Sequence, residues 1–375
     1  ASGEQIWKDD GYAAARPEGG ASRHPGPRAS PAVSEGKVAT LGVDGVLSCL
    51  DASTGELLWR KKDFEGEIPR FSTSSSPLIV NGLCIAQIGS IVAYDLSSGE
   101  EKWQWAEDGP SYGSPTLIKL GGTKAIITPT EKNLVVLDVS NGELLWQMGY
   151  IQGRNNTATP IVDGQLLYLA GPSRGMSAYK LIKTDDGFDT DELWRNPENS
   201  LQFNDPILSN GFVYGISQRN ELFSINTETG DTAWILQVGP APASGAGQQG
   251  GGGGRANRGD RQQNPQGAPG DVRRGGGGQG QEGGQRGRRR PGGGSGQGGA
   301  GPSGFGSIVS AGSVLFVLTP TSELIVIKPG AEKSTELARY KVSESPTYAY
   351  PVVAGNRIYI KDQNSVNMYT VNQKE

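Results

Sequence analysis

One phrase recurs along the chain and restricts its fold more than any other feature. The copies read LDASTGELLWR at 50–60, YDLSSGEEKWQ at 94–104, LDVSNGELLWQ at 137–147 and INTETGDTAWI at 225–235. Each places an aspartate or asparagine, a glycine and a tryptophan at fixed spacing. Successive tryptophans along the chain are 44, 43, 48 and 40 residues apart, at Trp59, Trp103, Trp146, Trp194 and Trp234. This interval is typical of a four-stranded propeller blade.

The sequence within one repeat predicts four short strands. Residues 30–60 contain four β-rich runs separated by the turn signals EG, DG and STG. Helical spacing of apolar residues is not evident in these units, so the predicted class is all-β, with one meander of four strands per blade.

The repeated phrase also has a physical explanation. The acid at its start accepts hydrogen bonds from backbone amides two residues on, and the glycine four residues later takes a positive φ. The tryptophan then falls on the outer strand, where its ring fills the space between blades. Packing, rather than stacking on bases or sugars, is the role expected for Trp7, Trp59, Trp103, Trp146, Trp194 and Trp234.

Proline dipeptides count the blades, because proline is tolerated where a strand begins. The inner strands begin near Pro31, Pro77, Pro115, Pro160, Pro206 and Pro351, with FGSIV at 305–309 as a variant without proline. Seven blades are therefore predicted, with Tyr340 in place of the sixth tryptophan. The last has only three strands, and ASGEQIWKDD at 1–10 matches a fourth, so we expect the N-terminal strand to close the ring. The alternative is an eighth blade with a truncated N-terminus.

Residues 240–306 interrupt the pattern between blades five and six. They hold 27 of the 58 glycines and nine arginines against three acidic residues, a net charge of +6. With almost no apolar residues this segment is predicted to be a disordered loop. Residues 1–239 and 307–375 then form a single propeller. Phe305 is the only aromatic residue of the segment, which argues against binding of nucleic acid.

Few residues in the chain are typical of metal or nucleophilic sites. His24 is the only histidine, and Cys49 and Cys84 lie in apolar runs, so no metal site is predicted and the two thiols are expected in the core. No apolar run is long enough to span a membrane. No signal peptide is visible in this chain, which leaves the compartment and the true N-terminus open.

Loops that precede the inner strands converge on the axis of a propeller and form its usual ligand site. Three arginines there are able to hold an anionic or planar polar ligand, and a solvated axial channel is the alternative. The candidate ligand-binding residues are Arg28, Arg70, Tyr112, Arg154, Asn155, Phe203, Asn204, Tyr348 and Tyr350. No catalytic residue is assigned.

The repeated phrase resembles that of pyrroloquinoline-quinone-like (PQQ-like) β-propellers, a superfamily that includes quinoprotein alcohol dehydrogenases and the assembly factor BamB. The resemblance covers nearly the whole chain except 240–306. It implies a periplasmic or extracellular protein of the bacterial envelope. The dehydrogenases carry an adjacent cysteine pair beside the quinone and a bound calcium, and this chain has no such pair.

We therefore expect a non-catalytic binding or scaffold propeller without a cofactor, whose axial face takes another protein or a small polar ligand. The alternative is a dehydrogenase for alcohols or sugars that uses PQQ and calcium. The sequence leaves the oligomeric state, the partner and the role of the Gly/Arg-rich loop open.

Overall fold

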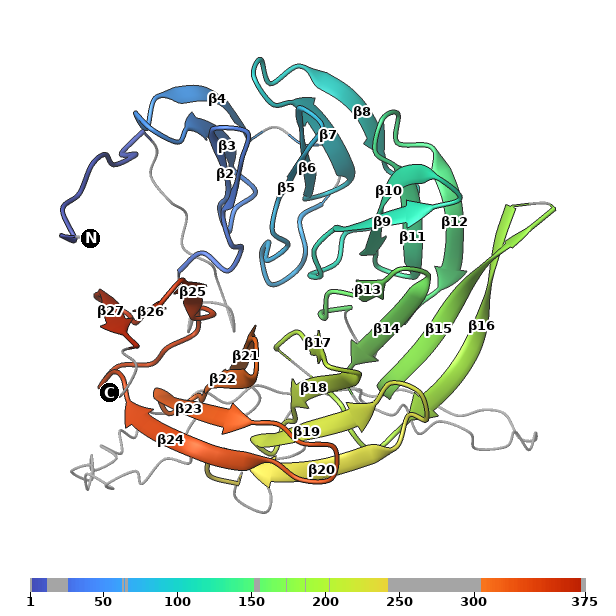
Figure 1. Ribbon diagram of the computed structural model, residues 1–375. Helices are drawn as coiled ribbons and strands as arrows, with labels where there is room; N and C mark the ends of the chain where they lie inside the picture. Colours follow the sequence, from blue (N-terminus) through green and yellow to red (C-terminus); the bar gives the residue numbers. More distant parts are fainter. Residues whose placement is uncertain are drawn as a thin grey trace, which may run out of the picture. The chain divides into compact units, whose positions relative to one another are not determined.

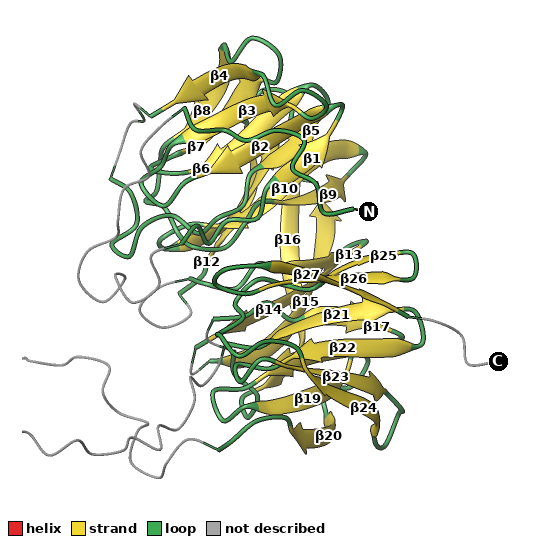
Figure 2. Cartoon of the chain, turned by 90° about the vertical axis from the view of Figure 1, so that its left-hand side faces the viewer, coloured by secondary structure: helices red, strands yellow, loops and turns green. Residues whose placement is uncertain are grey.

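The computed structural model describes residues 2–11, 26–62, 64, 67–151, 156–172, 174–185, 187–201, 203–241 and 305–371. Over these ranges the backbone forms strands, turns and loops, and Figure 2 shows no helix in them. A helix that could cross a membrane is therefore not found in the described part of the chain. The strands form six sheets of four strands and one sheet of three.

The first three blades follow one another in chain order (Figure 1). Blade one consists of β1 (Ala32–Ser34), β2 (Lys37–Leu41), β3 (Leu47–Asp51) and β4 (Leu57–Lys61). Blade two consists of β5 (Leu78–Val80), β6 (Leu83–Gln87), β7 (Ile91–Asp95) and β8 (Glu101–Trp105). Blade three consists of β9 (Thr116–Leu120), β10 (Thr123–Pro129), β11 (Asn133–Asp138) and β12 (Leu144–Gly149).

The next two blades repeat this order, and blade four has the longest hairpin. Blade four consists of β13 (Ile161–Asp163), β14 (Leu166–Gly171), β15 (Gly175–Thr184) and β16 (Gly187–Asn196). Blade five consists of β17 (Ile207–Ser209), β18 (Phe212–Ile216), β19 (Glu221–Asn226) and β20 (Thr232–Gln237).

The last two blades complete the series. Blade six consists of β21 (Ser307–Ala311), β22 (Val314–Leu318), β23 (Glu323–Lys328) and β24 (Thr335–Lys341). Blade seven consists of β25 (Val352–Ala354), β26 (Arg357–Lys361) and β27 (Val366–Thr370). Every sheet is an antiparallel meander of consecutive strands. The prediction of an all-β, seven-bladed propeller is confirmed.

The turn between the third and fourth strands has the predicted local chemistry. In blade one, Oδ1 of Asp51 accepts the backbone N–H of Ser53 at 2.9 Å and that of Thr54 at 3.1 Å. Gly55 has φ 74°. A β-bulge between Cys49 and Leu50 precedes the turn. Blades two, three and five have the same bulge before their turns, so the repeated phrase encodes one fixed backbone geometry.

Four of the six docking tryptophans pack on the turn glycine of the following blade. Nε1 of Trp59 donates to the carbonyl of Leu96 at 3.0 Å, and a Cβ added at Gly99 would lie 2.6 Å from Cγ of Trp59. The glycine is thus needed for its positive φ and also because the indole leaves no space for a side chain. The same contact joins Trp103 to Gly142, Trp194 to Gly230 and Trp7 to Gly55.

Two tryptophans vary this contact, because the turns that receive them differ. Trp234 donates to the carbonyl of Gly330 at 2.8 Å in blade six. Trp146 is buried in the core shared by blades three and four, where the long β15–β16 hairpin replaces the tight turn.

Tyr340 does not take the position of the sixth tryptophan. In blades one and three the tryptophan pairs with the residue just before the bulge, as Trp59 pairs with Cys49. In blade six the residue in that register is Ala338, which pairs with Val326. Tyr340 lies two residues further on and is 57% exposed.

The hydrophobic core is divided among neighbouring blades. Leu47 and Cys49 of blade one form a cluster with Cys84 and Val92 of blade two. Full burial stabilises each apolar side chain by about 1.5–3 kcal/mol. Both thiols are buried and free, and burial raises the pKa of Cys49 to about 11 and that of Cys84 to about 12. These cysteines therefore pack as small apolar side chains.

The fourth strand predicted for blade seven at residues 1–10 does not form, but the N-terminal segment contacts blade one. Trp7 contacts blade one in the way that each outer tryptophan contacts the next blade, with Nε1 donating to the carbonyl of Ala52 at 3.2 Å. Asp9 forms an ion pair with Arg60. Residues 2–10 have no strand pairing in the structure, so the sheet of blade seven keeps three strands.

Of the predicted loop 240–306, residues 242–304 lie outside the described part of the chain. The strands that flank it, β20 and β21, belong to consecutive blades.

Candidate functional site

Hydrogen bonds join the blades in a series where the inner strands begin. First strands of neighbouring blades contact one another there, as β1 does β5 and β9 does β13. The residue directly before each inner-strand proline donates its backbone N–H to the side-chain oxygen of the equivalent residue in a later blade. The bonds run from Ser30 to Ser76 (2.9 Å), Ser76 to Ser114 (2.9 Å), Ser114 to Thr159 (3.2 Å), Thr159 to Asp205 (2.7 Å) and Asp205 to Tyr350 (2.9 Å). We call these six residues the axial ring.

Blade six does not contribute to the axial ring, because its residue at this position is Gly306. A Cβ at Gly306 would collide with Cδ1 of Ile216. The N–H of Asp205 in blade five is bound instead by the hydroxyl of Tyr350 in blade seven, 145 residues away in the sequence. The long side chain of Tyr350 thus reaches past blade six, which has no side chain at this position.

Asp205 is the single acidic residue of the axial ring. Its Oδ1 accepts the backbone N–H of Thr159 at 2.7 Å. Burial raises the pKa of the Asp205 carboxyl, against the lowering effect of hydrogen bonds from Thr159. Within the described residues, no lysine or arginine forms an ion pair with this carboxyl. The ring therefore contains a half-buried carboxyl that has no counter-charge among these residues.

Aromatic side chains contact one another in the segments that lead into blades five, six and seven. The rings of Phe203 and Phe305 are stacked, with centroids 4.6 Å apart and planes at 13°. Tyr348 meets Phe305 edge-on, with centroids 6.1 Å apart. Phe203 and Tyr348 remain 51% and 44% exposed. We call these three residues the aromatic cluster.

A second group of candidate residues lies where blades one, two and three begin. The guanidinium of Arg28 donates to the carbonyl of Phe71, and the N–H of Phe71 donates to the hydroxyl of Tyr112 at 3.1 Å. The guanidinium of Arg70 lies 5.4 Å from the ring centroid of Phe71. Burial lowers the pKa of Arg28 and raises that of Tyr112. Arg28 and Tyr112 thus hold neighbouring loops together.

The structure therefore sorts the candidate residues from the sequence into two groups. Arg28, Arg70 and Tyr112 meet around Phe71, whereas Phe203, Tyr348 and Tyr350 belong to the aromatic cluster and the axial ring. Asn204 is buried, and its Nδ2 donates to the carbonyl of Ile216 at 3.0 Å. Arg154 and Asn155 lie outside the described residues.

Of the six residues that form the ring, sequence reasoning selected only Tyr350. At the other prolines it selected side chains nearby and passed over the residue directly before each one. The signal was present, because Ser or Thr fills this position in blades one to four and an aspartate fills it in blade five. Asp205 therefore differs from its equivalents in the sequence, because it is an acid at a position where the first four blades have a hydroxyl.

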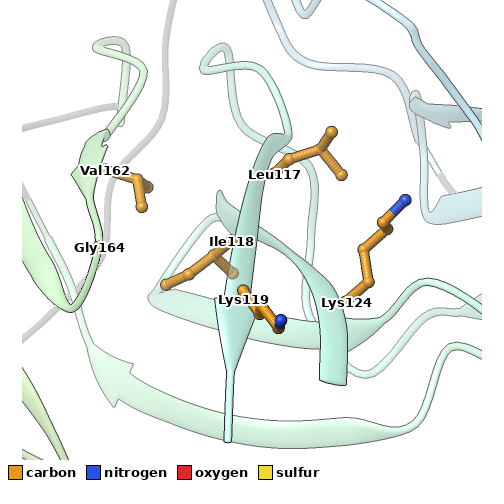
Figure 3. Close-up of a pocket in the computed structure, with 6 residues that line it drawn as sticks. All are labelled: Leu117, Ile118, Lys119, Lys124, Val162 and Gly164. Carbon is orange, nitrogen blue, oxygen red and sulfur yellow. The ribbon is translucent and has the colours of Figure 1, made fainter. Parts of the chain in front are cut away.

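A separate groove lies between blades three and four (Figure 3). Leu117, Ile118 and Val162 line it together with the side chains of Lys119 and Lys124. Nζ of Lys124 donates to Oδ1 of Asn81 at 2.7 Å. The groove contains none of the residues of the axial ring or the aromatic cluster.

Comparison with known proteins decides the family. A family model described as "Outer membrane protein assembly factor BamB" matches residues 1–236 of the chain. The chain belongs to this family. Curated BamB proteins from Shigella dysenteriae and Escherichia coli are 25% and 24% identical to the chain over 165 residues. Each match covers 42% of the chain and 40% of the relative, so the chain spans well under half of the relatives it matches.

Quinohemoprotein alcohol dehydrogenases are also similar to this BamB-family chain. One from Comamonas testosteroni is 35% identical over 82 residues, which cover 20% of the chain and 12% of that protein. Among solved structures, BamB from Moraxella catarrhalis has a TM-score of 0.60 at 15% identity and covers 93% of the chain and 84% of its own length. A dehydrogenase from Pseudomonas putida has a TM-score of 0.53 at 13% identity, over 88% of the chain and 61% of its own length. These structural likenesses support the propeller fold.

Proposed function

We propose that the chain is a non-catalytic binding propeller of the bacterial cell envelope, on the periplasmic side, and that it takes part in the assembly of outer-membrane proteins. Membership of the BamB family supports this proposal. According to this proposal, a protein partner binds to the face of the propeller that carries the axial ring.

The exposed aromatic cluster is the observation that carries the proposal. Aromatic side chains dominate the binding energy of protein interfaces when they are rigid and central. Phe203 is half exposed and is fixed by stacking on Phe305, so it loses little freedom when it is buried by a partner. The axial ring ties the loops of the cluster to neighbouring blades, which keeps this surface preformed.

Site-specific photocrosslinking in cells tests where the partner binds. A photoreactive amino acid in place of Phe203 is expected to crosslink to a component of the outer-membrane assembly machinery. The matched control is Leu337 on β24, which is 54% exposed and lies outside the ring and the aromatic cluster. Equal crosslinking from both positions, or none from Phe203, would contradict the proposal.

A functional measurement complements the crosslinking. Phe203→Ala is expected to lower the amount of folded outer-membrane protein in cells, while Leu337→Ala leaves it unchanged. The level of each variant protein is measured in parallel, so that loss of the propeller is not mistaken for loss of binding.

A dehydrogenase that uses PQQ and calcium is the second candidate function, and the similarity to quinohemoprotein alcohol dehydrogenases motivates it. The described donor set does not fit calcium, which takes six to eight oxygen ligands. No group of three or more His, Cys, Asp or Glu side chains occurs within the described ranges. Uptake of PQQ by the purified protein, with turnover of an alcohol that Arg154→Ala abolishes, would favour the enzyme instead.

A further inference from the structure

Asp205 carries the one carboxyl of the axial ring. Its hydrogen bonds come from Thr159, a neutral residue, and no described cation pairs with it. An ionised carboxylate that is half-buried without a counter-charge is less well solvated than in water, and a cation that enters the site offsets this cost.

The loops that carry Asp205 and its partner Tyr350 also carry exposed aromatic residues. The N–H of Asp205 is bound to the hydroxyl of Tyr350, whose pKa is raised by burial and then by the charge of Asp205. Phe203 lies two residues before Asp205, and Tyr348 two residues before Tyr350. Aromatic faces attract organic cations within about 6 Å. The site thus combines one carboxylate with exposed aromatic rings.

We propose that Asp205, Tyr350 and the aromatic cluster form a binding site for an organic cation, namely a primary ammonium or a guanidinium group. The carboxylate forms the charge-assisted hydrogen bond, and the exposed rings of Phe203 and Tyr348 cover the alkyl part of the ligand and stabilise its charge. This chemistry is found in free amines and in lysine or arginine side chains of a partner. The inference uses the face named in the proposed function.

A metal ion fits the same residues poorly. Asp205 is the one carboxyl of the axial ring, and the other ring oxygens come from neutral hydroxyls. Hard cations such as calcium need several oxygen ligands, often from more than one carboxylate. The rings of the aromatic cluster provide no oxygen ligands for such a metal ion, whereas they add to the affinity for an alkylammonium ion.

Titration calorimetry with small probes tests the site on the purified full chain. n-Butylammonium and n-butylguanidinium are expected to bind, and the neutral 1-butanol is not. Asp205→Asn is expected to weaken the binding of both cations by about tenfold or more, the effect of one hydrogen bond to a charged group. Asp163→Asn makes the same change at the end of β13, outside the ring, and is expected to bind like the wild type.

Further variants keep the test decisive if Asp205→Asn does not fold. Phe203→Leu retains an apolar side chain but loses the aromatic face. It is therefore expected to weaken the binding of both cations, with little change in the melting temperature of the protein. No binding of either cation to the wild type, or equal binding to the wild type, Asp205→Asn and Phe203→Leu, would overturn the proposal. Calcium binding that depends on Asp205, without amine binding, would overturn it as well.

Two arms of the experiment separate the sources of the cation. A blocked tripeptide with a central lysine binds at least as tightly as n-butylammonium if the site receives a side chain of a partner. Spermidine binds more tightly than the peptide if the site receives a free polyamine. These measurements use no partner protein, and the crosslinking uses no added amine, so each proposal can fail without the other.

Discussion

The indole of Trp7 packs directly on Gly55, where an added Cβ would lie 2.5 Å from Cδ2 of the ring. This is the relation of Trp59 to Gly99 and of Trp103 to Gly142, in which a blade is joined to its successor. Trp7 therefore gives blade one the contact that an outer tryptophan gives each following blade. No strand pairs with β27 on its outer side in the described structure, so the predicted closure is present only where Trp7 meets blade one.

Removal of Trp7 should weaken the propeller. We expect Trp7→Ala to lower the free energy of unfolding by about 1–3 kcal/mol, because a partly buried aromatic contact and its hydrogen bond to Ala52 are lost. Urea unfolding measures the change. Ile6→Ala is the control, since Ile6 is 87% exposed and its loss should cost less than about 0.5 kcal/mol. Equal costs for the two variants, or a deletion of residues 1–10 without effect on melting temperature and monomer state, would contradict closure by Trp7.

Gly99 should tolerate alanine poorly for two separable reasons. The residue has φ 70°, and an added Cβ would lie 2.6 Å from Cγ of Trp59. Gly82 has φ 71° but no atom within 4 Å of an added Cβ. Gly82→Ala is therefore expected to cost about 1 kcal/mol from backbone strain alone. Gly99→Ala is expected to cost at least about 2 kcal/mol more, because Trp59 must move. Chemical unfolding of both variants gives the comparison, and similar costs would show that the indole yields freely.

The propeller was predictable from the sequence because its signals are local. An Asx turn, a glycine and a tryptophan at fixed spacing define each third hairpin without knowledge of the rest of the chain. Tyr340 was assigned wrongly because Ala338, which pairs with Val326 next to the bulge, takes the tryptophan position of blade six. The bulge lies at the same place in the other blades, but blade six has no tryptophan there to mark the position in the sequence.

The site was predictable only to the level of a face. Convergence of the inner strands followed from the fold class, so the sequence pointed to the loops before the prolines as the region of a site. The pairing of Asp205 with Tyr350 could not be predicted, since it depends on the absence of a side chain at Gly306 and on the position of Ile216. Such contacts come from the packing of three blades rather than from the pattern within one.

Acid should remove part of the stability that the turn carboxylates provide. Hydrogen bonds from Ser53 and Thr54 hold the pKa of Asp51 at about 2, below its ordinary value of 3.8. A carboxyl whose folded pKa is lowered stabilises the fold above its ordinary pKa, and this stabilisation is lost as the pH falls through the folded value. The difference in free energy of unfolding between the wild type and Asp51→Asn is therefore expected to shrink as the pH falls from about 4 to about 2.

The chain contains a reciprocal control for this effect. Asn226 occupies the same turn position in blade five and accepts the N–H of Glu228 at 2.8 Å. Asn226→Asp should introduce an acid-sensitive contribution of the same sign at that turn. Urea unfolding of both variants across the pH range checks the result, and parallel curves for wild type and Asp51→Asn would contradict it.

The Gly/Arg-rich segment should be dispensable for folding. It contains almost no large apolar residues, and the two strands that flank it belong to consecutive blades. A short Gly/Ser loop in place of 240–304 is therefore expected to preserve cooperative unfolding. Phe305 is kept because it stacks on Phe203. Calorimetry of the shortened chain checks the result. Loss of a single cooperative transition would show that the segment is structural, and tight, salt-resistant binding of RNA by the full chain would assign it to nucleic acid instead.

The axial ring should behave as a series of individual hydrogen bonds whose loss is local. In Ser76→Ala the N–H of Ser30 loses its acceptor, while the N–H of Ser76 still has the hydroxyl of Ser114. The free energy of unfolding is expected to fall by about 1 kcal/mol, the usual cost of one such bond. Ser76→Thr is the matched control, because Thr159 serves as the acceptor in blade four and a threonine retains the hydroxyl.

Amide hydrogen exchange distinguishes this local loss from a general loosening of the propeller. Exchange at Ser30 should accelerate in Ser76→Ala, because its amide is left to water, whereas exchange at Ser114, whose N–H is bound to Thr159, should keep its rate. In Ser76→Thr both amides should exchange as in the wild type. Faster exchange at both positions in Ser76→Ala would show that the ring opens as one unit, so that each bond holds several blades rather than two.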